Sequence, residues 1–186
     1  TWPTMAPYTN PKNYNSTMNH KKLFNFVDYM ERLTKQNKLA KAEEFHPCKC
    51  SGIAHLEGII ANMRTKEAFV CTSDVTDEST VSRGGGFFKR RVFTSFIVKR
   101  FRTGDMESYE EALDICRELA RQFHSKFLLD AEEKKNELAF LNAASVKSRE
   151  LGGHFLDGAT GLYFTISMDE PINLVYDKNE WDTTSD

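Results

Sequence analysis

The sequence predicts an α+β fold: a two-layer domain in which a mostly antiparallel sheet packs against two helices, with an extended N-terminal arm and a long β-hairpin loop. Two segments repeat apolar residues at spacings of three and four, which is typical of helices with one buried face. Two others alternate apolar and polar residues, which is typical of strands. No internal linker rich in Pro, Gly and Ser divides the 186 residues, so we expect an arm over residues 1–18, one domain over 19–177 and a charged tail over 178–186.

The first twenty residues contain three of the five prolines, a composition that opposes helix formation. We expect either a disordered end or an arm that docks on a neighbouring subunit through aromatic side chains. The anchors of such an arm would be Trp2, Tyr8 and Tyr14.

A helix is predicted from about Asn19 to Lys41, because its apolar residues follow the helical period and Asn19 suits an N-cap. Residues 46–55 then read as a connecting loop. Residues 66–73 are rich enough in β-forming side chains to predict a strand, which we expect to begin near Gly58.

Residues 73–86 combine acidic and hydroxyl side chains with three consecutive glycines, so we expect a long mobile loop with a glycine hinge. The segment that follows, FFKRRVFTSFIVKRF at residues 87–101, is dense in β-branched and aromatic side chains. It predicts the strongest strand in the chain.

A second helix is predicted after Asp105, with a capping box at residues 108–111 and a continuous apolar stripe up to Phe127. Residues 130–137 either extend this helix or form a charged turn. We expect a short strand at residues 138–146. The alternation over residues 162–169 predicts a strand with one buried face, and the sequence INLVY at residues 172–176 predicts a last short strand.

The charge balance argues against nucleic acid and membrane partners. The chain has 25 basic and 27 acidic residues, so no global positive field would attract nucleic acid or an anionic membrane. No stretch approaches the ~18 to 20 apolar residues of a membrane span. The N-terminal sequence lacks a signal-peptide pattern, and the four cysteines do not resemble a secreted disulfide framework. We therefore expect a cytoplasmic protein with reduced thiols that binds no membrane and no specific DNA sequence.

One group of residues could bind a metal. His46, Cys48, Cys50 and His55 are ligand types for zinc and lie within ten residues. Structural zinc sites usually place two to four residues between paired cysteines, whereas Cys48 and Cys50 are separated by one. We expect no cofactor, and keep a metal site at these four residues as the alternative.

Basic side chains bracket the predicted strand at residues 87–101. They could bind single-stranded nucleic acid, form a solvated rim, or pair with an acidic loop on a neighbouring subunit. The candidate interface residues are the basic Arg83, Lys89, Arg90 and Arg91 and the acidic Asp74, Asp77 and Glu78. No serine elbow, HExxH motif or paired-carboxylate frame is present, so we expect no enzyme.

The order of elements resembles one family. The first helix, the hairpin with its long loop, the helix MESYEEALDICRELARQF and the closing strand GATGLYFTISM are similar in layout to tail-terminator and tail-completion proteins of long-tailed phages and related contractile machines. The resemblance implies a ring, commonly sixfold, that caps a tail tube and meets other tail or neck proteins. It implies a structural, self-assembling protein, cytoplasmic during assembly and then part of the virion. The alternative is a small metal-binding or nucleic-acid-binding accessory protein.

Overall fold

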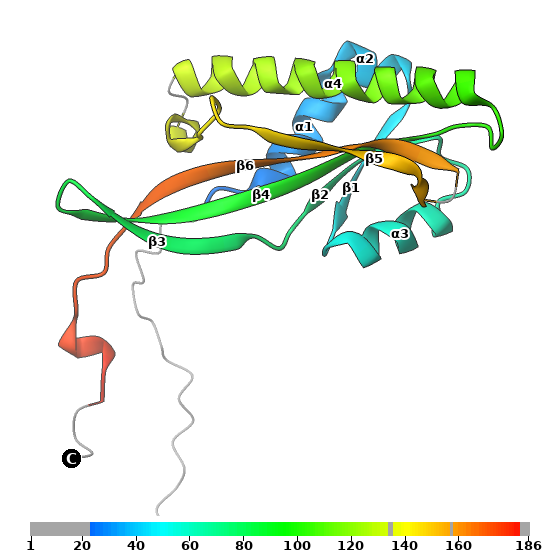
Figure 1. Ribbon diagram of the computed structural model, residues 1–186. Coiled ribbons are helices and arrows are strands. Elements are labelled where there is room, and N and C mark those ends of the chain that lie inside the picture. Colours follow the sequence, from blue (N-terminus) through cyan, green and yellow to red (C-terminus); the bar gives the residue numbers. More distant parts are fainter. Residues whose placement is uncertain (1–22, 134–135, 157, 183–186) are drawn as a thin grey trace, which may run out of the picture.

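The computed structural model describes residues 23–133, 136–156 and 158–182 (Figure 1). The elements follow in the order α1 (Phe26–Gln36), α2 (Lys38–Ala42), β1 (Phe45–Cys50), α3 (Ile53–Asn62), β2 (Ala68–Ser73), β3 (Asp77–Arg83), β4 (Gly86–Arg100), α4 (Met106–Glu132), the 3₁₀ helix η1 (Asn136–Phe140), β5 (Lys147–Leu156), β6 (Ala159–Ile172) and the 3₁₀ helix η2 (Lys178–Glu180). The predicted arm and its anchors Trp2, Tyr8 and Tyr14 lie outside the described residues.

The strands form one mostly antiparallel sheet in the order β1-β2-β4-β6-β5, and β3 pairs with the first half of β4. β1 and β2 are parallel and place Cys48 beside Cys71. β4 and β6 pair along their whole length, from Phe87 opposite Ile172 to Arg100 opposite Ala159. The predicted α+β class with a mostly antiparallel sheet is confirmed.

Helices α1, α2 and α4 lie on one face of the sheet (Figure 1). The main core lies between α1, α4 and the sheet; its largest members are Phe26, Tyr29, Met30, Phe93, Phe123, Phe127 and Phe164. Helix α3 lies on the opposite face at one end, where Leu56 and Ile60 pack on Phe69, Phe96 and Val98. The sheet therefore has a second, smaller apolar cluster beyond the predicted two layers.

Side-chain caps decide where the helices begin. Asn25 caps α1, because its Oδ1 accepts from the Asp28 amide at 3.2 Å, so this helix starts later than predicted. Asn37 ends α1 and caps α2. α4 is capped by Asp105, whose Oδ1 accepts from the Ser108 amide at 3.0 Å. The predicted capping box at residues 108–111 is wrong by one turn.

Several local predictions are wrong where the sequence lacks a clear period. Residues 45–50 form β1 instead of a loop, and residues 53–62 form α3 instead of the start of a strand. The predicted mobile loop is largely β3, and its glycines form the tight turn to β4, with φ of +57° at Gly84 and +82° at Gly85. Residues 138–146 form no strand: they include the end of η1 and one bridge from Leu141. β5 was not predicted.

Polar strands explain most of these differences. All residues of β3 are exposed except the half-buried Val81, so the strand carries no hydrophobic alternation and is defined by its pairing with β4. The predicted last strand at residues 172–176 is wrong: Ile172 is the end of β6, and residues 173–176 pair with no strand of the described sheet. Among the described residues, no helix is long and apolar enough to cross a bilayer.

Candidate functional site

A three-stranded extension of the sheet lies beyond its helical cover. We call it the wing; it consists of β3, residues 86–92 of β4 and residues 167–172 of β6. Figure 1 shows the β3–β4 hairpin and the end of β6 extending past α4 and η1, while α3 lies at the other end of the sheet. In Figure 1 no helix of the described residues covers the outer part of the wing on either face, whereas Met168 and Glu170 at its base are buried.

One face of the wing is organised around Asp169. Arg90 donates to it through two parallel hydrogen bonds of 2.7 and 2.8 Å, and Arg83 lies 3.1 Å away. The hydrogen bonds from Arg90 hold the pKa of Asp169 below its usual value, and the positive charges of Arg90 and Arg83 add to this effect. The carboxylate thus joins β6 to β4 and to the β3 end of the hairpin turn.

The other face is organised around Glu78. Lys89 lies 2.7 Å from its carboxylate and Arg91 lies 3.6 Å away. The pKa of Glu78 is lowered, mainly by the hydrogen bond from Lys89. The predicted interface charges Arg83, Lys89, Arg90, Arg91 and Glu78 therefore form ion pairs within one chain, and their role at an interface stays a prediction. Asp74 also pairs internally, with Lys49 at 3.5 Å, and Asp77 remains exposed on β3.

These pairs make the wing sensitive to acid. A carboxylate with a lowered pKa in the folded state stabilises that state above its unfolded pKa, and the contribution disappears as the pH falls through the folded pKa. We expect the free energy of unfolding to decrease as the pH drops below about 4, the ordinary range of Asp and Glu. Asp169→Asn should flatten this slope in pH-dependent urea unfolding, while Asp77→Asn, on the same wing, should leave it unchanged. If the pH dependence of the unfolding free energy were unchanged in Asp169→Asn, the ion pairs of Asp169 would not be the source of the acid sensitivity.

At its base the wing holds the segment that enters α1. Arg91 Nη1 donates to the Phe24 carbonyl at 2.8 Å and to Glu170 Oε2 at 3.1 Å, and the Phe24 amide donates to Glu170 Oε1 at 3.0 Å. The side chains of Arg91 and Glu170 are only 13% and 7% exposed. The guanidinium also lies 4.8 Å from the centre of the Phe93 ring. We call Phe24, Arg91 and Glu170 the clamp.

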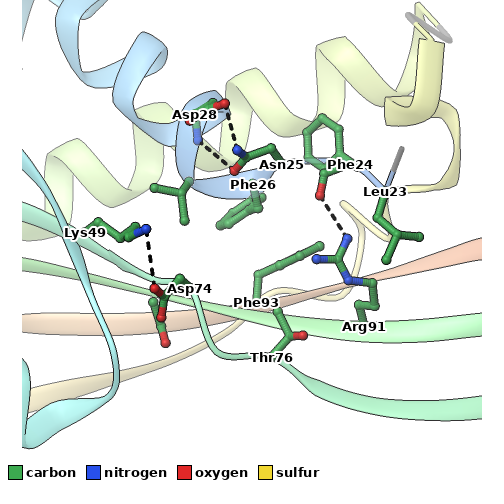
Figure 2. Close-up of a pocket in the computed structure, with 12 residues that line it drawn as sticks. Leu23, Phe24, Asn25, Phe26, Asp28, Lys49, Asp74, Thr76, Arg91 and Phe93 are labelled. Atoms are coloured by element: carbon green, nitrogen blue, oxygen red, sulfur yellow. Dashed lines mark hydrogen bonds and ion pairs between the residues drawn. The ribbon is translucent and has the colours of Figure 1, made fainter. Parts of the chain in front are cut away.

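A pocket of about 280 Å³ opens beside the clamp (Figure 2). Leu23, Phe24, Phe26 and Phe93 supply apolar walls, and Lys49 and Asp74 form one polar side. The Ser51 hydroxyl donates to Asp74 at 2.7 Å and, with Lys49, holds the pKa of this carboxyl below its ordinary value. Asp74 is therefore a poor proton acceptor near neutral pH. The mixed lining suits an inserted side chain.

The four potential zinc ligands do not form a metal site. Cys48 forms a disulfide with Cys71, so the expectation of reduced thiols is wrong for this pair. Cys50 is fully buried, and burial raises the pKa of its thiol to about 11. The Ser51 amide donates to His55 Nδ1 at 3.0 Å. Across the described residues, no three His, Cys, Asp or Glu side chains are placed to hold a metal ion.

The basic side chains at the far end of β4 are also engaged. Lys99 lies 3.2 Å from Glu43, and Arg100 donates to the carbonyls of Lys66 and Ile60 at 2.9 and 2.6 Å. Arg102 lies 2.9 Å from Asp105. These contacts favour a structural role for the basic side chains. They do not favour a row of free cations that could bind single-stranded nucleic acid.

Sequence reasoning missed Phe24, Asp169 and Glu170. Asp169 is the last residue of the alternating segment and Glu170 follows it, but only the register of β6 against β4 places them opposite Arg90 and Lys89. Compared with known proteins, the chain matches no family model, no curated protein and no solved structure.

Proposed function

We propose that the protein is a structural, self-assembling subunit of a ring similar to the tail terminators that close the end of a phage tail or a related tube. The wing is the observation that carries this proposal. The outer part of the wing has no helix of the described residues on either face, so its backbone and side chains are available to a neighbouring subunit. In this proposal the protein catalyses no reaction, needs no cofactor, and meets other tail or neck proteins, first in the cytoplasm and then in the virion.

Exposed apolar side chains at the wing support the proposal. Phe87, at the tip, is 46% exposed, and four further large apolar side chains follow β6: Leu174, Val175, Tyr176 and Trp181. Adjacent exposed apolar side chains of this kind mark interaction surfaces in soluble proteins. The internal ion pairs of the wing keep its strands in register, so that it can act as a preformed contact.

The clamp and the pocket supply a second contact. They hold residues 23–25 at the base of the wing, shortly after the expected arm of residues 1–18 in the sequence. In the proposed ring this arm reaches a neighbouring subunit, with Trp2, Tyr8 and Tyr14 as anchors. An aromatic side chain is of suitable size and polarity for the mixed lining of the pocket.

Light scattering on the purified chain tests the proposal. We expect a mass several times the 21.4 kDa of one chain, with six copies as the commonest count implied by the resemblance. Zinc measured on the same sample should be far below one per chain. A monomer at every concentration would contradict self-assembly, and a monomer with one zinc per chain would favour the metal-binding alternative.

A further inference from the structure

The residues after β6 form an exposed apolar segment. We call residues 173–182 the β6 extension. Val175 is 79% exposed, Tyr176 66% and Trp181 62%. Tyr176 and Trp181 stack on each other with ring centres 6.1 Å apart. Figure 1 shows this segment running down from the end of β6, away from the helices α1, α2 and α4.

The first half of the extension has the composition of a strand. Residues 172–176 read INLVY, and β-branched and aromatic residues favour strands. In the single chain the strand stops at Ile172, and residues 173–177 have no strand beside them. A segment with strand propensity and no partner can add to the free edge of another sheet, where main-chain hydrogen bonds supply the affinity.

Among the described strands, β1, β3 and β5 each have one edge without a strand partner, and charge distinguishes these edges. The extension is acidic, with Asp177, Glu180 and Asp182 against Lys178. β1 contains Pro47, which has no amide to donate. β3 begins with Asp77 and Glu78, so it would repel an acidic strand.

The edge of β5 is complementary to the extension. Its first residues include Lys147 and Arg149, which are exposed and lie on the same face of the strand. Ser148 and Glu150 point to the other face, where Glu150 binds Arg117 at 2.7 Å. An acidic turn placed beside Lys147 and Arg149 would gain favourable charge contacts.

The strand-forming part of the extension, residues 173–176, cannot lie along the start of β5 in its own chain. Lys147 pairs with Thr165, seven residues before the end of β6. Seven residues of strand span roughly 23 Å, whereas the three residues between Ile172 and Tyr176 can bridge only about 14 Å. The bridge between Leu141 and Met168 also occupies the edge of β6 in between. The acceptor must therefore belong to another molecule.

We propose that residues 173–177 of one copy add as a strand to the outer edge of β5 in a second copy, with the acidic turn at residues 177–182 against Lys147 and Arg149. This inference rests on the proposed self-assembly, and it identifies the surfaces through which two copies would bind each other. Because donor and acceptor are different surfaces, the contact is heterologous, and repetition of it closes a ring or extends a chain.

Charge reversal tests the contact. The acceptor variant Lys147→Glu/Arg149→Glu and the donor variant Asp177→Lys/Glu180→Lys should each shift the light-scattering mass toward that of one chain, because like charges then meet. An equimolar mixture should recover the wild-type mass, since each donor finds an opposite acceptor. A chain carrying all four changes should also recover it. Lys38→Glu/Lys41→Glu, which reverses two exposed lysines of α2, is the matched control and should keep the wild-type mass.

The outcomes separate this inference from the proposed function. A wild-type chain that is monomeric at every concentration overturns both. A wild-type oligomer whose mass survives both charge reversals overturns the contact and leaves self-assembly intact. Dissociation of each variant without recovery in the mixture and in the fourfold variant also overturns the contact, because these charges then do not meet.

Discussion

Replacing Gly161 by alanine is expected to lower the free energy of unfolding by about 3 kcal/mol or more, from overpacking and backbone strain together. Gly161 lies in β6 with φ of +154°, directly against β4. An added Cβ would lie 2.9 Å from both Ile97 C and Val98 Cα, and closer still to the Ile97 carbonyl oxygen. All three atoms are backbone of a central strand, so they cannot move aside as a flexible side chain could.

Gly58→Ala is the matched control. Gly58 lies in α3, and a Cβ there would meet no atom within 4 Å. The same substitution should therefore raise stability by about 0.5–1 kcal/mol, through the helix propensity of alanine. Urea unfolding of both variants measures the difference. A loss below about 0.5 kcal/mol in Gly161→Ala, the range of ordinary surface substitutions, would contradict the close approach of β6 to β4.

Glu170→Ala should destabilise the protein by about 3–5 kcal/mol, the usual cost of removing one partner of a buried ion pair. The substitution leaves the Arg91 guanidinium buried without its carboxylate and removes the acceptor of the Phe24 amide. Arg91 Nε is already buried without a hydrogen bond, and the nearest carboxylate that remains, that of Glu78, lies 3.6 Å from it. The segment before α1 should also loosen, seen as faster hydrogen exchange at residues 24–28.

Two comparisons isolate the buried pair. Glu150→Ala removes an exposed carboxylate from β5, where the side chains of Arg117 and Glu150 are 47% and 51% exposed, and should cost much less because water screens that pair. Arg91→Met/Glu170→Met removes both charges, so it should be more stable than Glu170→Ala. If Glu170→Ala and Glu150→Ala lowered the free energy of unfolding equally, burial would not determine how much the clamp contributes to stability.

The sequence by itself determined the elements that bury one apolar side. The strand at residues 87–101, the closing strand and the helix that follows Asp105 were predicted because their apolar residues repeat with the period of the structure they form. The same reasoning missed β5 and read β3 as a loop. Both strands are polar on most positions, so no period marks them, and backbone pairing with β4 and β6 defines them.

The sequence predicted which charged residues belong to the candidate site, but only the tertiary structure shows which of them form ion pairs. For Arg83, Lys89, Arg90 and Arg91 the sequence left three roles open: a solvated rim, nucleic-acid binding or pairing with another subunit. The register of three strands places Asp169, Glu78 and Glu170 against them in the same chain. The parallel pairing of β1 with β2 likewise brings Cys48 to Cys71 across 23 residues. The local sequence shows which charged and sulfur-containing side chains are present. The register between strands that are distant in the sequence determines which of these side chains come into contact.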